Sequence, residues 1–210
     1  MCAHAVDKSP ERSPFRQLDG DFMKTIVQPT KQPAETRQRL LDEAARVILD
    51  KGLAGLTLDA VAKAAGVSKG GLLHHFPSKQ HLVDGLVVDL HEQFVERWKK
   101  LVDSDPIVPG RHTRAYLKLV TSERDDHASK LCNIIAVEDR QNHTMRDLWR
   151  NFLTSLLRTE NTGGVDPVTL AIVQLATDGL WLADLEGFFA GDTNLHNQIV
   201  ERLAQMTTQV

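Results

Sequence analysis

The sequence has little cysteine and no long apolar run. Two of its 210 residues are cysteine, Cys2 and Cys132, which excludes a disulfide framework and a CxxC metal or redox pair. No stretch of about eighteen consecutive apolar residues occurs, and the N-terminus lacks a basic segment that leads into an apolar one. These absences predict a cytoplasmic protein that is neither secreted nor inserted in a membrane.

The chain also has no excess of positive charge. Its formal net charge is −3, whereas a protein that binds a polyanion such as DNA normally has a basic surface. The charge is unevenly distributed, however. Residues 31–82 contain eight Lys and Arg against five Asp and Glu, while residues 83–210 contain thirteen against nineteen. A basic segment joined to a larger acidic one suggests a nucleic-acid module attached to a domain with another role.

Helical periodicity begins near Glu35 and continues to the end of the chain. Residues 1–33 contain four prolines and no sustained periodicity, which predicts a mobile tail. A helix from about Glu35 to Lys51 should follow, and then two shorter helices. Thr57 caps the first of these, which ends at Gly66, and Ser68 caps the second, which ends at Pro77. A long helix should then run from Ser78 to about Val102. Apolar spacing predicts further helices near 111–122, 127–138, 144–159, 167–189 and 194–208. No alternating strand pattern is present, so the predicted fold class is all-α.

Residues 57–76 form a candidate helix-turn-helix motif, in which Gly66 permits the backbone angles of the turn. Ala62 and Ala65 allow the two helices to approach closely. Gly70 and Gly71 weaken the second helix by about 1 kcal/mol each relative to Ala, which favours a contact surface over a purely structural role. The second helix of such a motif enters the major groove of DNA.

The sequence TLDAVAKAAGVSKGGLLHHFPSK, residues 57–79, resembles the signature of the TetR (tetracycline repressor) family. The capping residues, the turn and the terminal aromatic-Pro-Ser-Lys all agree with that signature. The pattern DGLWL at 178–182 is also similar to one that many members carry. The resemblance implies a three-helix DNA-binding domain at 34–82 and a helical effector-binding and dimerisation domain at 83–210.

In function, the resemblance implies a homodimeric transcription regulator, usually a repressor, that binds a palindromic DNA operator and is released by a small molecule. It implies no enzyme activity, cofactor or metal. It assigns phosphate contacts to Thr57 and Lys79 and the recognition surface to Ser68, Lys69, Gly70, Gly71, Leu73, His74 and His75. Many members have Thr or Ala, and Tyr, where this chain has Gly71 and Leu73. The two helices predicted over 167–189 and 194–208 should form the dimer interface.

The C-terminal half also contains candidate ligand-binding residues. Aromatic side chains there form either ordinary core or the wall of a ligand cavity. The candidates for the effector site are Cys132, Trp149, Phe152 and Trp181. Four acidic residues of the same half either face solvent or select a cationic ligand, and we interpret them as solvated: Glu138, Asp139, Asp178 and Asp184.

Two other functions compete with the regulator. Gly66-Val67-Ser68-Lys69-Gly70 matches the GxSxG elbow of hydrolases, but that elbow requires a preceding strand, and here a helix is predicted. A helical interaction module that has lost DNA binding is the other alternative, because of Gly71 and Leu73. The pattern that starts at His91 resembles the zinc motif HExxH but ends in Val95, so we interpret it as a solvated helix face.

Overall fold

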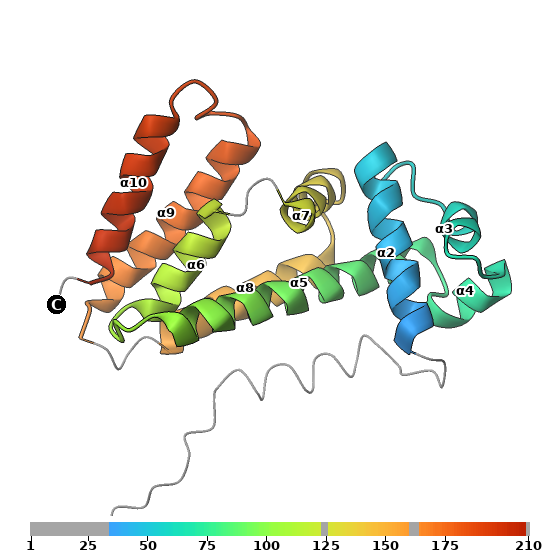
Figure 1. Cartoon of the computed structure of the whole chain (residues 1–210), viewed down its shortest axis with the longest axis horizontal. Coiled ribbons are helices and arrows are strands. Elements are labelled where there is room, and N and C mark those ends of the chain that lie inside the picture. Colours follow the sequence, from blue (N-terminus) through green and yellow to red (C-terminus); the bar gives the residue numbers. More distant parts are fainter. Residues whose placement is uncertain (1–33, 123–125, 160–163, 209–210) are drawn as a thin grey trace, which may run out of the picture.

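The computed structural model describes residues 34–122, 126–159 and 164–208, and every regular element in these ranges is an α-helix (Figure 1). The helices in chain order are α2 (Ala34–Lys51), α3 (Leu58–Ala64), α4 (Lys69–His75), α5 (Lys79–Ser104), α6 (Arg111–Ser122), α7 (His127–Glu138), α8 (His143–Thr159), α9 (Pro167–Leu185) and α10 (Thr193–Met206). The predicted all-α fold class is confirmed. The tail predicted over residues 1–33 lies outside the described residues.

The ends of the short helices follow the local sequence. Thr57 accepts a hydrogen bond from the Ala60 amide at 3.2 Å, and Ser68 accepts one from the Gly71 amide at 3.0 Å. Gly66, with φ 67°, ends α3 in the left-handed conformation that a glycine adopts most readily. Ser68 therefore caps a helix that follows another helix. The strand that a hydrolase elbow requires before its serine is not there, since residues 58–64 are helical.

One predicted boundary is wrong. The helix expected over 167–189 ends at Leu185, because Gly187 has φ 71° and reverses the chain. The Phe188 amide donates to the Ala183 carbonyl at 2.8 Å, and the Gly187 amide donates to the Asp184 carbonyl at 3.1 Å, which is the bonding pattern of a left-handed helix cap. The apolar residues after Gly187 continue the helical spacing in the sequence and concealed this stop.

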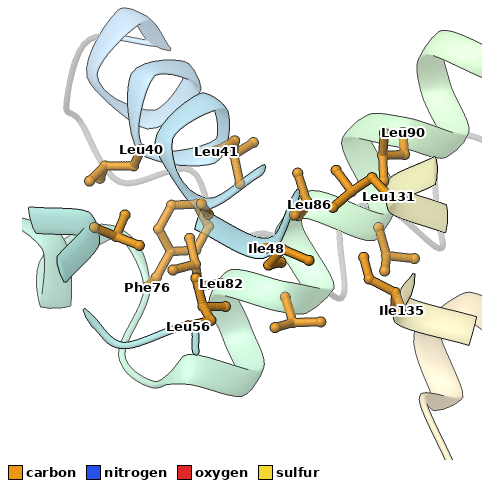
Figure 2. Packing of buried hydrophobic residues seen from close by; sticks show 14 of the residues in the cluster. Leu40, Leu41, Ile48, Leu56, Phe76, Leu82, Leu86, Leu90, Leu131 and Ile135 are labelled. Atoms are coloured by element: carbon orange, nitrogen blue, oxygen red, sulfur yellow. The ribbon is translucent and has the colours of Figure 1, made fainter. Parts of the chain in front are cut away.

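The long helix α5 connects two regions of the molecule, and its N-terminal half belongs to the core of the helix-turn-helix region (Figures 1 and 2). Leu82 and Leu86 of α5 pack there with Leu41 and Ile48 of α2. Helix α7 contributes to the same core through buried side chains, Leu131 and Ile135, which Figure 2 shows beside α5. Helix α7, which follows the domain boundary predicted at residue 82, thus packs against α2 of the predicted DNA-binding domain.

The C-terminal half of α5 packs in an aromatic core with α6 and α8. Trp98, which is 1% exposed, and Phe152 are 5.3 Å apart between ring centres. His91 also packs here, 5.6 Å from the Trp149 ring and 6.0 Å from that of Phe152, and its Nδ1 is buried. The expectation of a solvated face is therefore wrong for His91. Burial lowers the pKa of the His91 imidazole to about 4, since the charged form loses its hydration there.

We expect the stability of this aromatic core to depend on pH through His91. Its pKa is lower in the folded chain than the 6.5 of an unfolded one, so only the unfolded chain binds a proton between these values. The contribution of neutral His91 to stability is complete above pH 6.5 and is lost as the pH falls toward 4, by about 2 kcal/mol at pH 5.

Urea unfolding of the wild type and of His91→Leu at pH 7.5 and pH 5 tests this expectation. The free energy of unfolding of the wild type relative to the variant should fall by about 2 kcal/mol between the two pH values. A difference that does not change with pH would contradict the assignment, whatever the cost of the substitution itself.

Helix α9 has an unusually apolar outer face. By length and composition it is apolar enough to cross a membrane, with a mean hydropathy of 1.3 over its most apolar window. Polar residues nevertheless interrupt its apolar sequence at several positions. It packs against α6 and α10 and buries Val173 and Leu180 in their common core. Its exposed apolar side chains, which we call the α9 outer face, are Val168, Ile172, Leu175 and Leu182. Their spacings of four, three and seven residues place them along one side of the helix.

Candidate DNA interface and ligand cavity

One side of helix α4 packs in the core, and the opposite side faces solvent. Leu72 and Phe76, 0% and 3% exposed, lie in the core of the helix-turn-helix region. The side chain of Leu73 is 37% exposed, so it belongs to the surface and not to that core. The other predicted contact residues that face solvent on or beside α4 are Ser68, Lys69, Gly70, Gly71 and His74. The structure thus brings the predicted recognition residues together on one short helix.

The two glycines of α4 are not required by packing inside the protein. A Cβ atom at Gly70 would have one near neighbour, the Ser68 hydroxyl oxygen at 4.0 Å. A Cβ at Gly71 would lie 3.3 Å from the same oxygen, which is tight but involves a side chain. Neither glycine has a positive φ. Neither packing nor backbone conformation requires these glycines, and without a Cβ atom both positions are open to a close approach from outside the protein.

Lys69 of the predicted recognition surface and the two predicted phosphate-binding residues, Thr57 and Lys79, differ in how freely their side chains project. The Lys69 ammonium lies 3.0 Å from the Asp59 carboxylate in an exposed pair that a phosphate can replace. The Lys79 ammonium is held inside the protein surface, where it donates to the Leu53 carbonyl oxygen at 2.7 Å. Thr57 is exposed and uses its hydroxyl oxygen to cap α3. Lys69 is therefore the more available of the two cations.

His75 and Arg37 form the edge of this surface. His75 is half-buried, and its pKa is lowered by that burial and further by the neighbouring charges of His74 and Arg37. The Arg37 guanidinium lies 5.3 Å from the centre of the Phe76 ring, in the range of a cation–π contact. The sequence analysis did not select Arg37, because its place beside α4 depends on how α2 packs and has no signal in the motif itself.

A second candidate site is a cavity of about 760 Å³ between α5, α6, α7, α8 and α9. This volume lies within the range of sites that bind small organic ligands. Cys132, Trp149 and Trp181, three of the four predicted ligand residues, line its wall. Phe152 is the exception. It is 4% exposed and packs behind Trp149 in the aromatic core, because its ring is enclosed by the side chains of α5 and α6.

Two pairs of side chains in the cavity wall are joined by hydrogen bonds. The Tyr116 hydroxyl donates to the Asp178 carboxylate at 2.5 Å, and the Trp181 indole donates to the Asn133 carbonyl oxygen at 2.9 Å. Burial raises the pKa of Asp178, and the hydrogen bond from Tyr116 offsets part of that rise. Burial also raises the pKa of the Cys132 thiol to about 12, so this cysteine is an apolar wall residue and not a reactive thiolate.

Asp178, interpreted from the sequence as a solvated side chain, is half-buried in this wall. No sequence signal singles out Tyr116 and Asn133 together for this site. Asp178 and Trp181 are three residues apart on α9 and therefore lie on the same side of that helix, which is a signal that the sequence did contain. Tyr116 is the only tyrosine of the chain, and its buried hydroxyl needs a partner. The pairing itself joins residues that are 62 positions apart, and no local pattern predicts it.

Helix α7 lies between the cavity and the helix-turn-helix region. Cys132, Asn133 and Ala136 line the cavity, whereas Leu131 and Ile135 belong to the core around α2. The last residue of α7, Glu138, continues this connection, because its side chain reaches the loop between α2 and α3.

The Glu138 carboxylate accepts a hydrogen bond from the Leu53 amide at 2.8 Å. A Cβ atom at Gly52 would lie 3.1 Å from the same carboxylate, so the glycine leaves room for this close approach. The Leu53 carbonyl oxygen accepts from Lys79 at the start of α5. One residue of the α2–α3 loop is thus held from both sides, by α7 through its amide and by α5 through its carbonyl.

Comparisons with known proteins agree with this arrangement. Residues 40–86 match the model of the tetR family of bacterial regulatory proteins, and residues 110–208 match that of a tetracyclin repressor-like C-terminal domain. The first match contains the helix-turn-helix motif, and the second contains most of the cavity wall. The chain belongs to the TetR family of transcriptional regulators. Members of this family bind DNA operators, dimerise and respond to small molecules.

Individual relatives are similar over different lengths. The regulator CymR of Pseudomonas putida is 29% identical over 173 residues, which cover 73% of this chain and 84% of CymR. The repressor KstR2 of Mycolicibacterium smegmatis is 36% identical over 73 residues, so this chain spans 36% of its length. A solved TetR-family member from Streptomyces coelicolor has a TM-score of 0.61 at 24% identity, over 80% of this chain and 98% of that one.

Proposed function

We propose that this TetR-family protein is a repressor that binds a palindromic operator as a homodimer in the cytoplasm and is released by a small organic molecule. The domain boundary predicted at residue 82 separates the two activities in sequence, although α5 is continuous across it. The DNA contacts proposed are Ser68, Lys69, Gly70, Gly71, Leu73, His74 and His75 on or beside α4, with Thr57 and Lys79 at its edges. Cys132, Trp149 and Trp181 are proposed to contact the ligand.

The observation that carries this proposal is the double role of α7. Its buried leucine and isoleucine side chains are part of the core around α2, while its next side chains form the cavity wall. A ligand that displaces α7 therefore displaces the α2–α3 loop through Glu138. Release of DNA requires that the ligand bind more tightly to the displaced arrangement, since equal affinity for both would shift nothing.

The dimer is proposed to form through the α9 outer face and α10. A two-fold symmetric dimer places its two α4 helices in successive major grooves about 34–36 Å apart, which accounts for a palindromic operator. The apolar side chains exposed on α9 lose their contact with water when a second copy covers them.

Selection of genomic DNA fragments by the purified full chain tests the proposed function. We expect enrichment of fragments that share a palindrome whose half-sites are about one helical turn apart. Binding with no sequence preference, or no binding, would support the alternative of an interaction module that has lost its operator. The enriched sequence then provides the operator DNA for measurements of binding affinity and its salt dependence.

Removal of the available cation on α4 should weaken DNA binding without changing its sequence preference. We expect Lys69→Ala to reduce the slope of log affinity against log salt by about two per dimer, since each subunit loses one phosphate contact. Lys100→Ala, on the exposed surface of α5, is the matched control and should leave the slope unchanged. An unaltered slope in Lys69→Ala, or a loss confined to the operator, would contradict a phosphate contact.

A further inference from the structure

The charged side chains around the cavity are not equivalent. Arg97 is paired with Asp126 at 2.7 Å, and Asp184 lies 3.3 Å from the His196 imidazole. Asp139 accepts from the Asn142 side-chain amide at 3.0 Å and is followed in the chain by Arg140, which lines the same cavity. Asp178 differs from these residues, because no charged residue adjoins it in the chain and none contacts it. Within the described part of the chain, its only hydrogen-bonding or charged partner is the Tyr116 hydroxyl, a neutral donor. The negative charge of this half-buried carboxylate is therefore held in place and not compensated.

The position of Asp178 makes this charge available to a ligand. Tyr116 is 4% exposed and fixes the carboxylate oxygen Oδ1, while Oδ2 has no hydrogen-bond partner among the described residues. Burial raises the pKa of Asp178, and no cationic side chain opposes that rise. A positive group beside Oδ2 would stabilise the carboxylate in an environment where charge interactions are stronger than in water.

The surrounding wall suits a cation with an apolar body. Phe94, Trp149 and Trp181 provide aromatic rings in the same cavity, and the Asn133 side chain fixes the orientation of the Trp181 indole. Aromatic rings attract organic cations through their π-electrons in addition to excluding water from them. Arg140 and Arg146 also line the cavity, but both are solvent-exposed, so water screens their charges.

We propose that the cavity binds an organic cation whose apolar groups fill the aromatic wall and whose positive charge lies against Asp178. This inference rests on the proposed function, in which the cavity is the effector site, and specifies the chemical class of the effector. Asp178 selects the charge of the ligand, and the volume of about 760 Å³ admits a body of several rings.

Three probes of similar shape and different charge test the assignment: tetraphenylphosphonium, triphenylphosphine oxide and tetraphenylborate. Binding to the full chain is followed by quenching of tryptophan fluorescence, since Trp149 and Trp181 are in the wall. We expect the phosphonium cation to bind at least about tenfold more tightly than the neutral oxide or the borate anion. Tighter binding of the borate, or no binding of the phosphonium, would overturn the proposal.

Substitution of Asp178 by asparagine separates charge from shape. Asp178→Asn keeps an oxygen that accepts from Tyr116 and removes the negative charge. It should weaken phosphonium binding at least about tenfold and leave binding of the neutral oxide within about twofold, which also verifies that the cavity is intact. Glu186→Gln removes a carboxylate charge from the exposed end of α9, outside the cavity wall, and should have little effect. Unchanged phosphonium affinity in Asp178→Asn would contradict the role of this carboxylate.

Measuring how far each probe releases the protein from the selected operator tests the proposed ligand class separately from the proposed regulator function. Release by the oxide or the borate, and not by the phosphonium, overturns the cation class and leaves a ligand-released regulator. Failure to find any operator overturns the proposed function, whereas phosphonium binding that depends on Asp178 would still support the site.

Discussion

Leu175→Glu should convert the dimer into a monomer and abolish specific binding to the operator. Leu175 is 70% exposed at the middle of the α9 outer face, where a second copy is proposed to cover it. In a symmetric dimer the substitution buries two carboxylates that have no partner, at a cost of several kcal/mol. We expect dimerisation to weaken at least about 1,000-fold, which corresponds to about 4 kcal/mol.

Sedimentation velocity at micromolar concentration and operator binding measure this effect together. Ile107→Glu replaces another exposed apolar side chain, 48% exposed and outside α9, with the same charge and is the matched control. It should remain dimeric and bind DNA. A Leu175→Glu chain that stays dimeric, or a monomer with full operator affinity, would contradict the proposed interface.

Glu138→Ala should separate ligand binding from DNA release. The substitution removes the acceptor of the Leu53 amide without altering the cavity wall, so probe affinity should change little. The change in operator affinity that the probe causes should fall toward none, from a wild-type coupling that is typically 5–150-fold in such proteins. The reason is that α7 loses its hydrogen bond to the α2–α3 loop.

The coupling is measured as the ratio of operator dissociation constants with and without whichever of the three probes releases the wild type. Glu138→Gln retains an oxygen that accepts from Leu53 and should keep a larger part of the ratio than the alanine variant does. Equal ratios in the wild type and in Glu138→Ala would exclude this hydrogen bond from the coupling.

The features that the sequence predicts correctly are those that depend on neighbouring residues. Thr57 and Ser68 cap helices because their side chains reach an amide three residues ahead, and Gly66 ends one because of its own backbone freedom. The error in the predicted C-terminal boundary of α9 also has a local cause, since Gly187 is followed by apolar residues that continue the helical spacing. Local chemistry thus accounts for the placement of α3 and α4.

The environment of the cavity depends on contacts between distant helices and was predicted less well. Trp149 and Phe152 are both aromatic and three residues apart on α8, yet one lines the cavity and the other packs behind it. Nothing in their own sequence distinguishes them. His91 is buried for the same kind of reason, because the rings that enclose it come from α8. The predicted DNA contacts remain predictions until an operator is in hand.

One residue of α9 belongs both to the α9 outer face and to the wall of the cavity. Leu182 is 52% exposed on the α9 outer face and also lines the cavity, one helical turn from Asp178. In the proposed dimer, subunit association and effector binding act on the same side chain, so their equilibria would be thermodynamically linked. Apparent effector affinity should then depend on protein concentration near the dissociation constant of the dimer. Variants of α9 selected for a new effector would at the same time alter subunit assembly.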